Sequence, residues 1–136
     1  MSSAAHSFAG HTGELAICLR ADSLAALFAE AGRALAEVMS GLAPHADGGY
    51  ERVSVQAPDR DALLVAWLDE LVFLAERDKK VFGDLRIERL TAHELVASVR
   101  GEATSELKTH VKAATFHGLK IVDDPEGVTA TVILDI

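Results

Sequence analysis

The C-terminal stretch VKAATFHGLKIVDDPEGVTATVILDI (residues 111–136) carries the clearest fold signal in this sequence. Two of its runs, Thr115–Asp123 and Val128–Asp135, are rich in apolar and β-branched residues and are predicted to be β-strands. The DDPEG segment between them is a hairpin signal, because Pro125 presets φ and Gly127 tolerates a positive φ. The end of the sequence is therefore predicted to be an antiparallel strand pair.

The last predicted strand ends on two acidic groups. Asp135 supplies one carboxylate and the terminal carboxyl group of Ile136 supplies another, so that two hard oxygen donors lie close together. Hard oxygen donors suit cations such as Ca²⁺ and Mg²⁺. The sequence thus offers a candidate divalent cation site at the end of this strand.

Two helices are predicted before the C-terminal stretch. Apolar residues recur at helical spacing over residues 24–39, where Asp22 or Ser23 can cap the start and Gly41 suits the end. After an exposed loop at Gly41–Gly49, a second helix begins near Pro58 with Asp59 as its cap. Its apolar stripe consists of Leu63, Leu64, Trp67, Leu68, Leu71 and Leu74, and this position predicts that Trp67 is a core residue.

The remaining segments are predicted to be strands. They comprise a strand pair around Ser7–Arg20, a half-buried strand through Val53 and Val55, and the runs Leu85–Thr91 and Leu95–Glu102. Two helices packed on a largely antiparallel sheet make an α+β fold, and residues 1–136 are expected to form one domain. The sequence contains no P-loop, GxGxxG or GxSxG motif, which argues against nucleotide-binding and hydrolase functions.

Composition limits the choice of partners and compartment. Thirteen basic and twenty-one acidic residues give a net charge of −8, which opposes tight binding to a phosphate backbone. Lys108, Lys112 and Lys120 are the only candidates for a basic patch, and a solvated edge is the preferred interpretation. No apolar run is long enough for a bilayer and no secretory signal is visible. Cys18 lacks an internal partner and is predicted to be a buried small hydrophobe, so a cytoplasmic location is expected.

A few side chains can carry chemistry. His11 and Glu14 share the HTGE segment, and His117 lies in TFHG. The histidines show no zinc-ligand spacing, so a zinc site is not expected. Glu14, Asp135 and the carboxyl group of Ile136 form a better set, because three oxygen donors would suit Ca²⁺ or Mg²⁺ if the first and last strands are neighbours.

The pieces KAATFHGLKI and VILDI resemble the C-terminal signature of the archeases, small proteins that assist RtcB-type RNA ligases in tRNA splicing and RNA repair. HTGELAI at His11–Ile17 sits where archeases carry an HTADxG-type motif. DRDALLVAWLDELVFL at Asp59–Leu74 resembles their central LLxxWLxELL helix. Three motifs in the right order cover nearly the whole chain and make the resemblance specific.

The resemblance implies a metal site formed by Glu14, Asp135 and Ile136, with Ca²⁺ as the expected ion. The sequence departs from the family pattern there, with Glu14 for aspartate, Gly13 for alanine and Ala16 for glycine. A longer glutamate would shift the coordination geometry or weaken binding. Three further residues, which the resemblance places beside the site or the partner, are His11, Lys112 and His117.

The function implied by the resemblance is that of a non-enzymatic activator. It would promote guanylylation and multiple turnover of an RtcB-type ligase that joins RNA ends bearing a 3′-phosphate or cyclic phosphate, with no tight RNA binding of its own and no membrane association. Two alternatives remain open. One is a small metal-dependent enzyme that uses Glu14, His117 and Asp135 as ligands and as general acid or base. The other is a protein-assembly chaperone without a metal.

Overall fold

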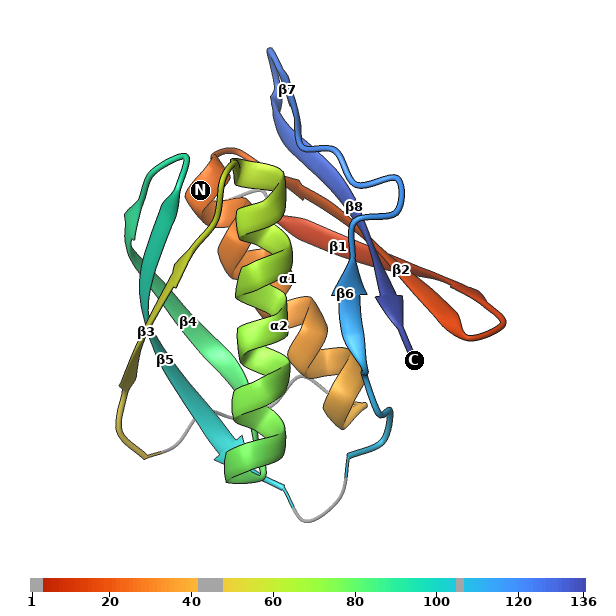
Figure 1. Ribbon diagram of the computed structural model, residues 1–136, viewed down its shortest axis with the longest axis vertical. Helices are drawn as coiled ribbons and strands as arrows, with labels where there is room; N and C mark the ends of the chain where they lie inside the picture. The colour runs from red at the N-terminus through yellow and green to blue at the C-terminus, as the bar shows by residue number, and fades with distance from the viewer. Residues whose placement is uncertain (1–3, 42–47, 105–106) are drawn as a thin grey trace.

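The computed structural model describes residues 4–41, 48–104 and 107–136, with the side chain of His11 outside the description. Two helices alternate with eight strands in this part of the chain (Figure 1). In chain order, the elements are β1 (Ala5–His11), β2 (Glu14–Ala21), α1 (Leu24–Ser40), β3 (Glu51–Gln56), α2 (Arg60–Asp78), β4 (Lys80–Leu90), β5 (Glu94–Ala103), β6 (Ala113–Thr115), β7 (Val122–Asp124) and β8 (Gly127–Asp135).

The strands form two antiparallel sheets, with both helices between them (Figure 1). The larger sheet has the order β1-β2-β8-β6. Strand β6 pairs with the last residues of β8, and β7 pairs with the first residues of β8. The smaller sheet has the order β3-β5-β4. The predicted α+β class with two helices and antiparallel strands is confirmed, although the strands divide into two sheets where a single sheet was expected.

Helix α1 begins and ends as its sequence predicts. Of the two candidate caps, Ser23 serves, because its Oγ accepts a hydrogen bond from the Ala26 N–H at 3.1 Å. At the other end Gly41 adopts a left-handed φ of 80°, and its N–H donates to the Glu37 carbonyl at 2.7 Å. Residues 42–47 of the predicted loop lie outside the described residues, whereas Gly48 and Gly49 are exposed.

Helix α2 also follows the prediction. The Oδ1 atom of Asp59 accepts from the Ala62 N–H at 2.8 Å, and the helix continues to Asp78. Trp67 is fully buried, and its indole N–H donates to the Phe28 carbonyl of α1 at 2.9 Å. Because a buried indole needs such an acceptor, this hydrogen bond fixes how the two helices pack. The prediction that Trp67 is a core residue is confirmed.

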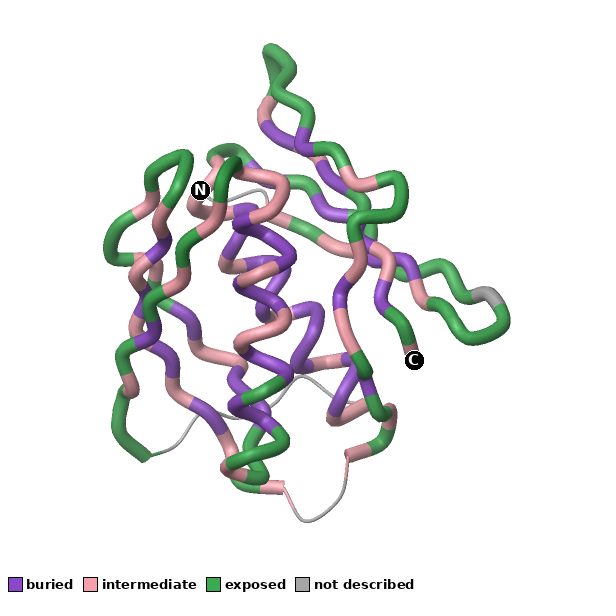
Figure 2. The backbone as a smooth tube through the Cα atoms, viewed as in Figure 1, coloured by how far each residue is buried: buried purple, intermediate pink, exposed green. Residues whose placement is uncertain are grey.

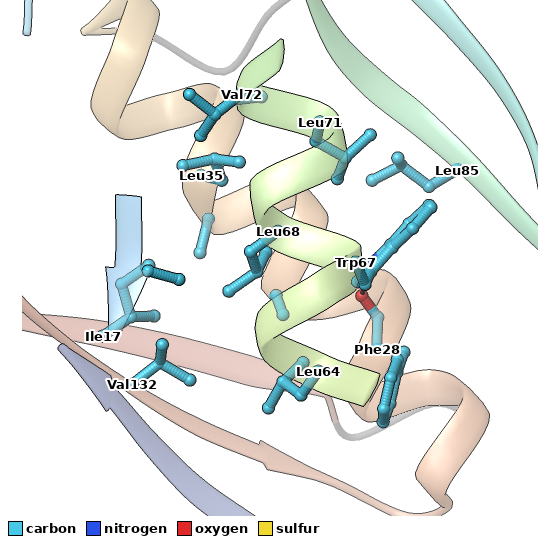
Figure 3. Packing of buried hydrophobic residues seen from close by; sticks show 14 of the residues in the cluster. Ile17, Phe28, Leu35, Leu64, Trp67, Leu68, Leu71, Val72, Leu85 and Val132 are labelled. Carbon is cyan, nitrogen blue, oxygen red and sulfur yellow. Dashed lines mark hydrogen bonds between the residues drawn. The ribbon is translucent and has the colours of Figure 1, made fainter. Parts of the chain in front are cut away.

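The core lies between the two sheets and is built from both helices (Figure 3). Trp67 and Leu64 of α2 pack near Phe28 of α1, with Ile17 and Val132 from the larger sheet on one side. Figure 2 shows the same division by burial: the helices and the inner strand faces are largely buried, whereas the tips of the β1–β2 and β7–β8 hairpins are exposed.

The predicted strand Thr115–Asp123 is wrong in extent. Strand β6 stops at Thr115, a turn follows in which the Leu119 N–H donates to the Phe116 carbonyl at 3.0 Å, and β7 covers only Val122–Asp124. Helix α2 supplies a reason, because its Asp61 and Arg60 side chains bond the N–H and C=O groups of Ile121, which a strand ladder would otherwise use. The DDPEG hairpin itself is confirmed, with Asp124 paired to Gly127 at a φ of 145°.

The burial predicted for Cys18 is also wrong, because its side chain is exposed. Successive residues of a strand point to opposite faces of the sheet. In β2, Ile17 and Leu19 face the core, which turns Cys18 to the outer face. Strands β3, β4 and β5 occur where strands were predicted, although β4 starts at Lys80, ahead of the predicted Leu85.

Neither described helix combines the length and the apolar character that crossing a lipid bilayer requires.

Candidate functional site

The strand register of the larger sheet brings predicted site residues into one row. Glu14 is paired with His11 across β1 and β2, and with Asp135 across β2 and β8. On the far side of β8, Asp135 is paired with Ala113 of β6. Residues from the two ends of the sequence therefore meet at one end of the sheet, as a shared site requires.

Glu14 and Asp135 place two negative charges side by side. Directly opposite residues of antiparallel strands point to the same face, with Cβ atoms about 4.5–5.5 Å apart. Both residues are exposed. Within the described part of the chain, neither carboxylate has a salt-bridge partner. Like charges in this arrangement destabilise the sheet unless a cation lies between or beside them.

The last residue is held at the same end of the sheet. The Ile136 N–H donates to the Gly13 carbonyl at 3.1 Å, next to Glu14. Gly13 has a φ of 73° in the two-residue connection between β1 and β2. This left-handed conformation favours glycine, which gives a physical reason for Gly13 at this turn.

The candidates from the KAATFH segment divide between two places. The Lys112 N–H donates to the Asp135 carbonyl at 2.8 Å, so this exposed lysine starts at the carboxylate end. His117 lies beyond Thr115, and the register of β6 against β8 leads it away from Asp135. It is exposed, and its N–H donates to the Thr115 Oγ1 atom at 3.4 Å. The backbone of His11 lies in the row, but its side chain is outside the described residues.

Two acidic residues of α2, which the sequence did not single out, hold this segment in place. The Asp69 Oδ1 atom accepts from the Ala114 N–H at 2.7 Å, and the Asp61 Oδ1 atom accepts from the Ile121 N–H at 3.0 Å. Partial burial raises the pKa of Asp69, against the lowering effect of its hydrogen bond to Ala114. Little in the sequence sets them apart, because α2 also carries the acidic residues Glu70, Glu76 and Asp78.

Arg60 completes this attachment. Its Nη2 atom donates to the Ile121 carbonyl at 3.0 Å and lies 2.6 Å from the Asp123 Oδ2 atom. Helix α2 therefore binds the segment between β6 and β7 at both ends, which fixes where β6 meets Asp135.

A second group of charged side chains, which the sequence analysis did not single out, attaches β1 to α1. The His6 Nδ1 and Nε2 atoms lie 2.6 Å from carboxylate oxygens of Glu30 and Glu37, respectively, on α1. Both ring nitrogens face carboxylates, which favours the protonated imidazole, because only that form donates from both nitrogens. Burial alone would lower the pKa of His6, but the two hydrogen bonds outweigh it and the pKa is raised. Glu30 is buried, and its hydrogen bonds to His6 and Arg33 overcome desolvation and lower its pKa.

The donor set at the carboxylate end is small. Among the described side chains, no group of three or more histidine, cysteine, aspartate or glutamate residues is arranged to hold a metal ion. Glu14 and Asp135 supply two carboxylates, and a third protein oxygen would come from Ile136 or from another backbone group at this end of the sheet. Carboxylate and carbonyl oxygens are hard donors, which fits Ca²⁺ or Mg²⁺ and not a thiolate- or imidazole-bound metal.

The three lysines considered as a basic patch lie at three different places. The Lys108 N–H donates to the Met39 carbonyl at the end of α1. Lys112 precedes β6 at the carboxylate end, and Lys120 lies on the other side of the turn after β6. All three residues are exposed.

The fold and the site define a small α+β protein that holds two helices between two antiparallel sheets and presents paired carboxylates at one sheet end. The model of the archease protein family (MTH1598/TM1083) matches residues 6–136. This chain belongs to the archease family.

Similar proteins agree with this assignment. The chain is 28% identical over 134 residues to the protein archease of Methanosarcina acetivorans, covering 93% of this chain and 92% of that protein. It is 32% identical over 116 residues to the protein archease of Methanothermobacter thermautotrophicus, covering 81% and 83%.

Two solved structures share the fold. The solution structure of Methanobacterium thermoautotrophicum protein 1598 superposes with a TM-score of 0.75 at 29% identity, covering 96% of this chain and 98% of that one. The crystal structure of an archease from Thermotoga maritima, described as a possible chaperone, gives a TM-score of 0.67 at 20% identity, covering 94% of each chain. The second likeness concerns the fold alone.

Proposed function

We propose that this protein is a non-enzymatic activator of an RtcB-type RNA ligase in tRNA splicing or RNA repair, and that it promotes guanylylation and multiple turnover of that ligase. Membership of the archease family supports the proposal. The observation that carries it is the pairing of Glu14 with Asp135, with the backbones of Lys112 and Ile136 bonded at the same sheet end. These are residues that the motif resemblance associates with the site.

The proposed working end is a cation site. Glu14, Asp135 and the Ile136 carboxyl group would hold the ion, with Ca²⁺ preferred because its coordination tolerates the longer glutamate better than that of Mg²⁺. The ion would neutralise the crowded carboxylates and present a positive centre to the partner. Lys112 starts beside Asp135 and would contact the partner or the surroundings of the ion. The ligase would hold the nucleotide and the RNA.

The charge of the molecule supports a protein partner over direct RNA binding. A net charge of −8 repels a polyanion, and the three candidate lysines are not gathered into one surface. The exposed thiol of Cys18 suits a reducing compartment, so the proposed location is the cytoplasm.

The alternative of a metal-dependent enzyme receives less support from the geometry. It requires Glu14, Asp135 and His117 to converge, but the register of β6 leads His117 away from Asp135. We therefore expect the purified protein alone to show no ligase, nucleotidase or nuclease activity. A metal-free assembly chaperone would instead act without dependence on Glu14 or Asp135.

A single-turnover guanylylation assay tests the proposal. Substoichiometric amounts of the protein should raise the rate of covalent nucleotide attachment to its cognate ligase, and Asp135→Asn should remove this effect while the variant stays folded. Arg52→Gln is a matched control, because Arg52 is exposed on the smaller sheet. An unchanged ligase rate with the unmodified protein would refute the proposal, and full activity of Asp135→Asn would remove the carboxylate site from it.

A further inference from the structure

A second feature of the larger sheet lies on its outer face, away from the helices. A groove of about 510 Å³ runs between strands β2 and β8 and the segment that connects β6 to β7. Its lining consists of Cys18, Leu19, Arg20, Gly118, Lys120, Val122, Thr129, Ala130 and Thr131. None of the residues assigned to the carboxylate site lines it, so it is a distinct feature.

The register explains the chemistry of this groove. Cys18 pairs with Thr131 and Arg20 pairs with Thr129, so a thiol, a guanidinium and two hydroxyl groups project from the same face of neighbouring strands. Lys120 adds a second cation from the opposite wall. The hydroxyl groups can donate hydrogen bonds and both cations attract an anion, so the groove suits a ligand with a negatively charged group.

The cations are available to such a ligand. Arg20 lies 3.8 Å from Glu126, with side chains 61% and 83% exposed, which makes this a weak, solvent-screened pair. Within the described residues, Lys120 has no salt-bridge partner. A carboxylate entering the groove would therefore displace only a loose ion pair.

The surroundings limit the ligand to one with few charges. Asp123, Asp124 and Glu126 lie on the β7–β8 hairpin at one end of the groove, and Glu14 and Asp135 lie further along the same strands at the other end. A nucleic acid strand would set its successive phosphates against these carboxylates. A peptide with one acidic side chain avoids that repulsion, and the exposed apolar side chain of Val122 can contact the neighbouring residues of such a peptide.

The groove and the carboxylate site share one face of the sheet. Thr131 and Asp135 are four positions apart on β8, so both point outward and lie about 14 Å apart along the strand. An extended segment of a single partner can span this distance with four or five residues, at about 3.3 Å per residue.

We propose that the groove docks a short extended segment of the protein partner, whose acidic side chain pairs with Arg20 and Lys120 while the same partner reaches the carboxylate site. This inference rests on the proposed function, because it takes the RtcB-type ligase to be that partner. It assigns the ligase a second contact on the outer face of β2 and β8, independent of any metal.

The single cysteine of the chain provides a local test, because Cys18 lines the groove. The alkylation rate of Cys18 by N-ethylmaleimide would be followed by mass spectrometry of its peptide, with the protein alone, with saturating cognate ligase, and with RNA alone. We expect the ligase to slow alkylation strongly and RNA alone to leave it unchanged. Protection by RNA without protection by the ligase would overturn the proposal in favour of a nucleic-acid site.

Charge reversal supplies the second measurement. Arg20→Glu combined with Lys120→Glu should weaken ligase binding by about tenfold or more, since two attractive charges become repulsive. The control variant combines Arg52→Glu with Arg89→Glu on the outer face of the smaller sheet, and it changes the net charge by the same amount as the groove variant. Its affinity for the ligase should stay within about twofold of that of the unmodified protein. Thermal unfolding would confirm that both variants are folded. The combination of Arg20→Gln and Lys120→Gln removes the two positive charges without reversing them, and it should weaken binding less.

The outcomes separate the two proposals. If the unmodified protein binds and activates the ligase, but Cys18 stays fully reactive and the groove variant binds as well as its control, the docking inference is overturned and the proposed function stands. If the unmodified protein neither binds nor activates its cognate ligase, both are overturned.

Discussion

The outer faces of the two sheets handle charge in opposite ways. On the smaller sheet, the described charges neutralise one another: Arg100 donates to Asp84 at 2.8 Å, Arg52 lies 3.3 Å from Glu88, and Arg89 lies 3.2 Å from Glu94. At the end of the larger sheet, Glu14 faces Asp135, with no salt-bridge partner for either among the described residues. The charges of the first surface are paired with one another, whereas the two carboxylates of the second have no salt-bridge partner among the described residues.

This difference separates paired charges on the smaller sheet from carboxylates that, in the proposed function, act on a partner. Exposed ion pairs contribute little to stability, about 0–1 kcal/mol each, but they leave a surface with no strong demand for a ligand. Adjacent like charges destabilise the strand pair that carries them. A cation supplied by a metal ion or by the partner would remove that cost, which is why the proposed function places the contact at the carboxylate end.

The largest expected effect concerns the core on which both sheets rest. Trp67→Ala should reduce the free energy of unfolding by about 3–5 kcal/mol, because it removes a fully buried side chain and leaves a cavity. Urea unfolding measures this change. If Trp67→Ala instead abolished ligase activation with no change in stability, Trp67 would belong to a functional surface and not to the core.

Divalent cations should stabilise the carboxylate end of the larger sheet. The unmodified protein should gain stability with Ca²⁺, by about 2.7 kcal/mol when the free ion is a hundredfold above its dissociation constant. Asp135→Asn should abolish this gain, and an extra residue after Ile136 should reduce it by moving the terminal carboxyl group. The measurement is the melting temperature against Ca²⁺ and Mg²⁺ concentration. Loss of activation in Asp135→Asn, with no metal effect in either protein, would show that the carboxylates contact the ligase directly.

A third effect concerns His6 of β1, which lies between the carboxylates of Glu30 and Glu37. The pKa of His6 is raised above its ordinary value of 6.5, so its stabilising contribution is fully present below pH 6.5 and is lost as pH rises through the folded-state pKa. Glu30 acts in the opposite sense, because its lowered pKa makes its contribution fall as the solution becomes acidic. In the unmodified protein, the loss of the His6 contribution should lower the free energy of unfolding as the pH rises above 6.5. His6→Gln should make this decline smaller, which chemical unfolding at a series of pH values would measure. If the decline were the same in both proteins, the pH dependence would come from titratable groups other than His6.

The smallest effects should differ in sign between the two surfaces. Arg52→Gln breaks an exposed pair and should cost up to about 0.5 kcal/mol. Glu14→Gln relieves a repulsion and, without divalent ions, should stabilise the protein by a few tenths of a kcal/mol. Chemical unfolding in chelator, with both variants measured side by side, resolves the sign. Destabilisation by Glu14→Gln under these conditions would mean that the two carboxylates do not repel as their register implies.

The sequence predicted the features that depend on neighbouring residues. Ser23, Asp59 and Gly41 mark helix ends through local hydrogen bonds, and Gly127 marks a hairpin, so the elements they bound were recognisable. The predicted strand extends too far beyond Thr115 because Asp61 and Arg60, remote in sequence, bond the backbone of Ile121. The division into two sheets likewise depends on pairings between distant strands.

The candidate site was predictable in its parts but not in its arrangement. Motif resemblance selected Glu14 and Asp135, yet only the register between β2 and β8 places them opposite each other. Cys18 was misplaced because its apolar neighbours do not reveal which face of a strand is buried. The partners of His6 were missed because its two carboxylates come from a distant helix.

The attachment of the C-terminal segment to α2 has a consequence for local motion. The Ala114 and Ile121 amides are tied to Asp69 and Asp61, whereas residues 116–118 between them form an exposed turn. Amide hydrogen exchange should therefore be slow at the two tied positions and fast in the turn, because exchange requires opening of the bonded amide. The turn that forms one wall of the groove can then adjust to an incoming chain while both of its ends stay fixed to the helix.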